Sequence, residues 1–468
     1  MSSPQEQQKS KKPDDDDEFQ VTKKTKDSSK NSSAEPKTQI ASSQEEEKVS
    51  YQGGSTDATQ DSGSKTVTTG KHQQEEEKKE STHTQAADDD DDELELIEEK
   101  VKKSESDFKP MSNSFLIFVN HNICYFDFTE KKWNVGDLIG DAEEYPVLPN
   151  ASVILNPYAP VGQTQIIVSG GSNSGQSQSS VYRFELKLNK IMNNNLEAKL
   201  IDELTPLPFG LFEHQSVILH NKGDNKGIST LLVIGGKNVK TQSQSSSAVF
   251  ALKFKNLDSS KAKFEQVQDG QSEQVQEKNE EWMRMTDMLQ GRHSFSATPF
   301  EERYVYVYGG IIGNIQNKHQ AMIAHIVIEK FDLYENRWEK ITIQNTPQLS
   351  AFGHAFDIHN KKLYIVGGSN GKILQNETWQ IDFINQSATN MNLDMDISTA
   401  MSKVCVRSNR DDPKDVEIYS FGGLSTEGMN CFAKLGEKQS WEIFEESHLI
   451  MSTIADPELI FYPTVFIE

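Results

Sequence analysis

Three histidines could carry chemistry if the fold brought them together. His214, His293 and His354 each lie near the start of a predicted strand, in "EHQSVIL", "GRHSFSA" and "FGHAFDI". Histidine is a common metal ligand and general base. Ligands from three separate repeats could meet at one ion only near a common axis, and a residue that recurs in a repeat is first a structural feature. We therefore expect no metal site, no cofactor and no catalytic residue.

Other catalytic patterns are missing from the sequence. It contains no H-E-x-x-H, P-loop or G-x-S-x-G motif. Cys124, Cys405 and Cys431 lie in strand-like runs, where a thiol is usually a small buried apolar group. Three scattered cysteines predict neither a disulfide framework nor a zinc site, and they suit a reducing compartment.

A glycine doublet ends each of five apolar runs. "RYVYVYGG" is one example, and its Tyr304–Tyr308 segment suits a strand buried on both faces. The first glycines are 65, 74, 58 and 55 residues apart, which indicates a repeat array. Glycine accepts positive φ and permits close backbone approach, so we interpret the doublets as structural turns. The ten residues are Gly170, Gly171, Gly235, Gly236, Gly309, Gly310, Gly367, Gly368, Gly422 and Gly423.

A second recurring feature is an aspartate followed six residues later by a tryptophan. Asp127 precedes Trp133 and Asp332 precedes Trp338 by this spacing. Aspartate can accept a hydrogen bond from its own backbone two residues on, which favours a turn. Each repeat thus predicts four strands, the number in one propeller blade.

These features resemble the Kelch repeat family over about residues 111–468. The resemblance implies an all-β, six-bladed β-propeller at residues 108–468. The first unit, "SFLIFVNHNICYFDFTEKKW", lacks a doublet and one strand, while "ELIFYPTVFIE" at the C-terminus is a strand without a unit. We expect the C-terminal strand to close the first blade, which removes two exposed sheet edges.

Residues 1–107 differ from the rest of the chain. Residues 1–100 hold 26 Asp and Glu against 14 Lys and Arg, with few aromatic residues. Such a composition predicts a disordered acidic tail, because too little apolar surface is available to offset the ordering entropy. The tail is either a solvated segment or a docking segment for a basic partner.

The charge and composition also bear on location and partners. A net charge of −23 opposes direct binding to nucleic acid or to an anionic membrane. No signal peptide and no membrane-spanning run is evident. We expect a monomeric cytoplasmic protein, with "KKTK" at Lys23–Lys26 as a weak nuclear signal.

The loops that follow the doublets are mostly polar. Kelch propellers often grip peptides with such loops, so the resemblance implies a non-enzymatic scaffold or adaptor that binds a protein partner. The polar tail does not suit a folded ubiquitin-ligase adaptor domain. A propeller enzyme or small-ligand lectin is an alternative, as is a nuclear protein whose tail binds basic chromatin proteins. The partner-binding residues implied by the resemblance are Lys237, Arg292, Asn314, Phe352 and Asn370.

Overall fold

The structure is a computed structural model that describes most of the chain from Phe108 onwards. The described residues are 108–119, 122–189, 195–220, 227–241, 244–257, 281–312, 322–323, 327–395, 398–408, 416–425, 428–429, 432–435, 440–443 and 463–467. They belong to one unit, Gln85–Glu468, separate from the unit Met1–Thr84. The tail predicted at residues 1–107 lies outside the described residues, as does Cys431. In the described ranges no helix is long and apolar enough to cross a membrane.

The described part is almost entirely β-structure, as the sequence predicts. Four separate sheets have four antiparallel strands each, arranged in chain order. Their strands are β11 (Gln215–His220), β12 (Ile228–Ile234), β13 (Val249–Lys255) and β14 (Met283–Arg284); β15 (Ser296–Phe300), β16 (Tyr304–Tyr308), β19 (Ile328–Asp332) and β20 (Arg337–Ile341); β21 (Gly353–Asp357), β22 (Lys362–Val366), β23 (Thr378–Asp382) and β24 (Ser387–Asn390); β26 (Lys403–Ser408), β27 (Val416–Phe421), β30 (Phe432–Leu435) and β31 (Trp441–Ile443).

A nine-stranded sheet contains the first part of the body and the C-terminal strand. Its main path runs β32-β2-β3-β4-β10-β9-β6-β5, and β1 pairs with β9. The strands are β1 (Phe108–Pro110), β2 (Ser114–Val119), β3 (Asn122–Asp127), β4 (Lys132–Gly140), β5 (Ser152–Leu155), β6 (Gln165–Ser169), β9 (Val181–Asn189), β10 (Leu196–Leu204) and β32 (Thr464–Ile467).

Two results follow from the nine-stranded sheet. The C-terminal strand β32 pairs antiparallel with β2, with Ser114 opposite Ile467, so the predicted pairing of the C-terminal strand with the first unit is confirmed. Among the described residues four four-stranded sheets stand alone, fewer than the six blades expected. The parallel pairing of β4 with β10, with Leu138 opposite Leu196, joins the strands β32-β2-β3-β4 to the strands β10-β9-β6-β5 in one sheet.

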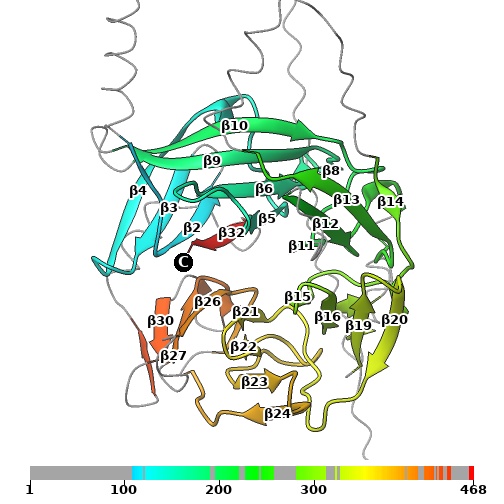
Figure 1. Cartoon of the computed structure of the whole chain (residues 1–468). Coiled ribbons are helices and arrows are strands. Elements are labelled where there is room, and N and C mark those ends of the chain that lie inside the picture. The colour runs from blue at the N-terminus through cyan, green and yellow to red at the C-terminus, as the bar shows by residue number, and fades with distance from the viewer. Residues whose placement is uncertain are drawn as a thin grey trace, which may run out of the picture. The chain divides into compact units, whose positions relative to one another are not determined.

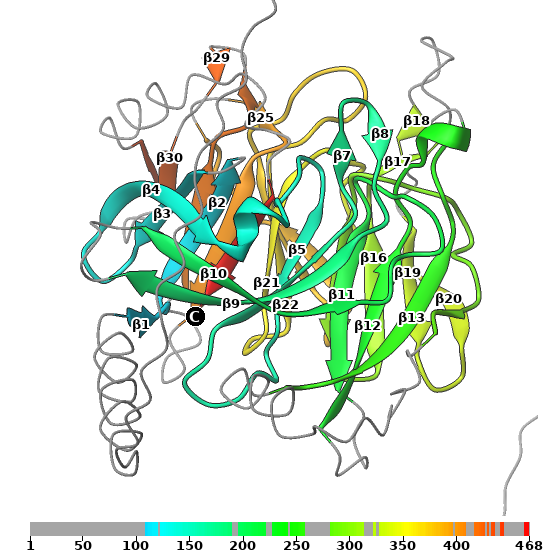
Figure 2. The ribbon, with the colours of Figure 1, turned by 90° about the horizontal axis from the view of Figure 1, so that it is seen from above.

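Short elements lie beyond the main sheets. Hairpin β7–β8 follows one glycine doublet, hairpin β17–β18 follows another, and both project at the same end of the sheets (Figure 2). The short strands are β7 (Ser172–Asn173), β8 (Gln176–Ser177), β17 (Ile311–Ile312), β18 (Met322–Ile323), β25 (Thr399–Ala400), β28 (Leu424–Ser425) and β29 (Gly428–Met429). The described residues also form two 3₁₀ turns, η1 (Asp141–Glu143) and η2 (Val239–Thr241).

The sheets are arranged around a common centre in a propeller-like manner (Figure 1). Six hydrophobic clusters lie between neighbouring β-layers. Alternate residues of the middle strand β16 explain this pattern, because Val305 and Val307 belong to one cluster and Tyr306 and Tyr308 to the next. The first and last layers also meet, since the ring of Phe115 stacks on that of Phe421 at 4.2 Å.

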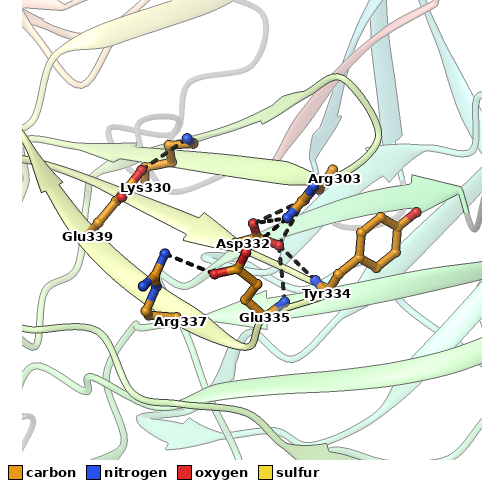
Figure 3. Close-up of polar contacts among 7 residues, drawn as sticks. All are labelled: Arg303, Lys330, Asp332, Tyr334, Glu335, Arg337 and Glu339. Carbon is orange, nitrogen blue, oxygen red and sulfur yellow. Dashed lines mark hydrogen bonds and ion pairs between the residues drawn. The ribbon is translucent and has the colours of Figure 1, made fainter.

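The aspartates shape turns, as their spacing predicts. Asp332 Oδ1 accepts hydrogen bonds from the backbone N–H of Tyr334 and Glu335, at 3.0 and 3.1 Å. Arg303 also donates to this carboxylate (Figure 3). Asp127, Asp357 and Asp382 each accept the same pair of backbone bonds.

We predict that β32 is required for stability. Deleting Pro463–Glu468 removes three buried side chains, Pro463, Val465 and Ile467, and exposes the backbone edge of β2. Each buried side chain contributes about 1.5–3 kcal/mol, so the melting temperature and soluble yield should fall. Thr464→Ala, in the same strand but only partly buried, should have little effect. Equal thermal unfolding of truncated and full chains would contradict the closure.

Candidate functional site

The glycine doublets bond each repeat to the next. The N–H of Gly171 donates to the carbonyl of Leu211 at 2.8 Å, that of Gly236 to Arg292 at 2.9 Å, and that of Gly368 to Thr399 at 2.7 Å. All ten doublet glycines have φ between 61° and 106°, the left-handed region that disfavours other residues. Each doublet thus has the backbone geometry that glycine accommodates best.

A ring of left-handed residues follows these bonds. Asn150, Glu213, Ser294, Ala351 and Met401 have φ between 50° and 59°, and each lies two residues before an innermost strand. The N–H of Glu213 donates to Asn150 O at 3.0 Å, and the N–H of Met401 to Ala351 O at 2.6 Å. Non-glycine residues rarely adopt this conformation, so its recurrence marks a shared structural position.

These five residues line a central cavity of about 300 Å³. The innermost strands of all four separate sheets lie around it or around a second cavity of about 330 Å³, and β32 and β5 complete the lining. The two cavities share Gln215, His354, Val404 and Phe466, so they follow one axis. We call this pair of cavities the central channel.

Glu213 is held in the channel by three polar neighbours. Its Oε1 lies 2.5 Å from Lys237 Nζ, and its Oε2 accepts bonds from His293 Nδ1 at 2.8 Å and Ser294 Oγ at 2.6 Å. A carboxylate only accepts, so the proton on His293 is on Nδ1. Burial alone would raise the pKa of Glu213, yet the His293 hydrogen bond and the Lys237 charge lower it to about 2. Glu213 is thus ionised and compensated at neutral pH.

Lys403 has a different environment in the same channel. It lines the first cavity, and within the described part of the chain no residue forms a hydrogen bond or ion pair with its ammonium group. Burial lowers the pKa of Lys403 to about 8, and the charge of Glu213 opposes this shift. His214 and His354 also line the cavity, and burial lowers the pKa of each to about 4, so both are neutral.

Three of the predicted partner-binding residues are buried, which corrects their expected exposure. Arg292 is fully buried, forms an ion pair with Glu329 and donates to Gly309 O at 3.0 Å. Lys237 is held by Glu213, and Phe352 packs on Gly309 with only 6% of its surface exposed. Phe352 thus packs between two repeats, whereas these side-chain contacts of Arg292 and Lys237 lie within one repeat.

The remaining residues are placed differently. Asn370 is exposed in the loop after the fourth doublet, where its Oδ1 accepts bonds from Lys372 and Ile373 backbone N–H groups. Asn314 lies outside the described residues. The four predicted binding residues that the structure describes do not form one exposed surface.

The three histidines do not share one repeat position. Relative to the left-handed residue of its unit, His293 comes one before, His214 one after and His354 three after. Among the described residues no group of three His, Cys, Asp or Glu could hold a metal ion. Cys124 and Cys405 are buried in one apolar cluster.

Repeat register could have revealed the buried residues. Arg292 stands two residues before a left-handed residue, in the place of Leu211, Leu349 and Thr399, and all four are buried. Phe352 likewise corresponds to His214 and Phe295. An alignment of the units on this register predicts that Arg292 is buried, although arginine side chains are usually exposed. Lys403 carries no sequence signal of comparable strength.

Comparison with known proteins adds no relatives. No protein-family model matches the chain, and no curated protein matches it significantly. These comparisons therefore assign no family to the chain.

The doublet glycines allow a controlled stability test. At Gly309, with φ 68°, an added Cβ would collide with the Phe352 ring and lie 2.9 Å from Leu349 O. At Gly175, with φ 76°, nothing lies within 4 Å. Gly175→Ala should cost about 1–2 kcal/mol from backbone strain alone, and Gly309→Ala about 1–3 kcal/mol more from overpacking. Denaturant unfolding that gives equal losses would show that the doublet contact is unimportant.

Lys403 predicts a specific pH dependence. Its pKa is near 8 in the fold and about 10.5 in the unfolded chain, so between these values the unfolded chain binds more protons and stability rises with pH. Relative to Lys403→Met, the wild type should gain on the order of 3 kcal/mol across this window. Urea unfolding at pH 7 and pH 10.5 measures the difference. Parallel profiles for the two proteins would show that Lys403 is normally solvated.

Proposed function

We propose that the chain is a non-enzymatic protein-interaction module built on a six-bladed Kelch-type propeller. In this proposal the nine-stranded sheet supplies two blades, β32-β2-β3-β4 and β5-β6-β9-β10. Six hydrophobic clusters between layers support that count. A sixth left-handed residue, Asn113, lies one residue before β2, close to the place that the other five hold two residues before their strands. The five doublets and the Asp–Trp spacing support the family.

The observation that carries the functional proposal is a shared location. The doublets bond carbonyls that lie two residues before the channel-lining left-handed residues. The loops after the doublets and the first cavity therefore occupy the same end of the sheets. A concave centre surrounded by adaptable polar loops is the arrangement that suits peptide binding. We call this end the doublet face.

The partner in this proposal is a protein, and the module itself is a cytoplasmic monomer. The net charge of −23 supports a protein partner over nucleic acid or an anionic membrane. The sequence KKTK is the only argument for the nuclear alternative. The acidic tail leaves a second docking role open to a basic partner.

Two exposed isoleucines of one sheet allow a matched test. Ile373 lies in the loop after a doublet and is 64% exposed, whereas Ile384 lies in the β23–β24 turn at the opposite end and is 62% exposed. A partner is first isolated with the wild-type full chain, and its affinity is then measured by calorimetry. Because interface centres carry most binding energy, Ile373→Asp should weaken binding about tenfold or more.

The control fixes the interpretation of that measurement. Ile384→Asp introduces the same charge at equal exposure and should leave the affinity unchanged, with both variants melting like the wild type. Loss of binding only in the Ile384 variant would place the interaction at the turn end. Unchanged binding in both would refute a role for the doublet face.

A further inference from the structure

Lys403 is the charged residue at a position that is otherwise neutral. It begins β26 two residues after Met401, and it lines the first cavity. The residues at the same distance from their left-handed residues are uncharged, namely Ser152, Gln215, Ser296 and Gly353. A lysine here is not required to build the innermost strand, because the other sheets form theirs without one.

The cavity supplies no counter-ion for this lysine. Glu213 is the only carboxylate in its described lining, and both of its oxygens are occupied by Lys237, His293 and Ser294. His214 and His354, the other titratable groups of the lining, are neutral. Lys403 is only half-buried, so its side chain is open to the cavity. A partly desolvated, unpaired ammonium is costly to the fold. A bound anion would remove that cost.

Two residues of the described cavity lining hold hydrogen-bonding atoms without partners. Among the described residues, His214 Nδ1 and Ser402 Oγ are buried without a hydrogen-bond partner, and both residues line the cavity. His214 Nε2 lies 2.9 Å from Ser169 Oγ. If that hydroxyl donates to Nε2, Nδ1 carries the proton. Buried polar atoms without partners are uncommon in folded proteins.

We propose that Lys403 binds a carboxylate group inside the first cavity of the channel. One ammonium balances one negative charge, as a single carboxylate carries. A phosphate group would bring a second charge toward Glu213 with no second cation to balance it. The volume of about 300 Å³ is at the lower end of ligand pockets, which suits a small acid or one acidic side chain.

The carboxylate could come from two sources, a free small acid or an Asp or Glu side chain of a protein. The protein source rests on the proposed function, whereas the small-acid source is independent of it. Two matched pairs of probes separate them. Butyrate is compared with butyramide, and the capped tripeptide acetyl-Gly-Glu-Gly-amide with its Gln analogue, all at constant ionic strength.

The measurement is the melting temperature of the full chain at pH 7. At about ten times its dissociation constant, a ligand specific for the folded state should raise the melting temperature by about 2 °C or more. At least one acidic probe should do so and its neutral amide should not. A shift with butyrate indicates the small-acid source, and a shift with only the Glu tripeptide indicates the protein source. No shift with either, or equal shifts with acid and amide, would overturn the proposal.

Lys403→Met should raise the melting temperature without ligand and abolish the response to the acidic probe. Lys372→Met removes an exposed lysine and should respond like the wild type. A wild-type response in Lys403→Met would overturn the assignment. A pH series on the wild type gives an independent test that does not require any variant to fold. The acid-dependent shift should be full at pH 7 and vanish above pH 10.5, and a shift that persists there would also overturn it.

Discussion

The hydrogen bond from a glycine doublet to the next repeat is the contact on which the other features depend. The second glycine donates to a carbonyl two residues before a left-handed residue, at 2.7–2.9 Å in three of the five repeats. A side chain at Gly235 or Gly309 would collide with the following repeat. Gly235 and Gly309, the first glycines of their doublets, must therefore lack a Cβ and adopt positive φ. This contact fixes the distance between sheets, and the hydrophobic clusters fill the space that remains.

The same contact determines where the channel residues lie. Because the bonded carbonyl precedes the left-handed residue by two positions, each repeat delivers one such residue to the cavity. The sheets thus build a polar centre from backbone geometry, and the side chains at that position are free to vary. Glu213 occupies that position, whereas Lys403 lies two residues after Met401, and the two charges differ in their surroundings. Glu213 is fully compensated, while Lys403 has no partner among the described residues.

Local signals predicted most of the fold. The apolar runs, the doublets and the Asp turns each depend on a few neighbouring residues, so the strands around Tyr304–Tyr308 and the turn at Asp332 could be read directly. The pairing of β4 with β10 could not, because two edge strands distant in sequence meet there without a local motif. The exposure of Arg292 was misjudged for a related reason. Its burial depends on Glu329, which is 37 residues away.

The pairing of β32 with β2 has a consequence for synthesis of the chain. Ser114 leaves the ribosome about 350 residues before Ile467, its partner in the sheet. At about 5–20 residues per second, β2 must wait roughly 20–70 seconds for the strand that covers its edge. During that interval Phe115 and Ile117 lack part of their final packing. Until β32 is made, the nascent protein therefore has an unpaired backbone edge on β2. A chaperone that covers this edge would favour correct pairing with β32 over aggregation.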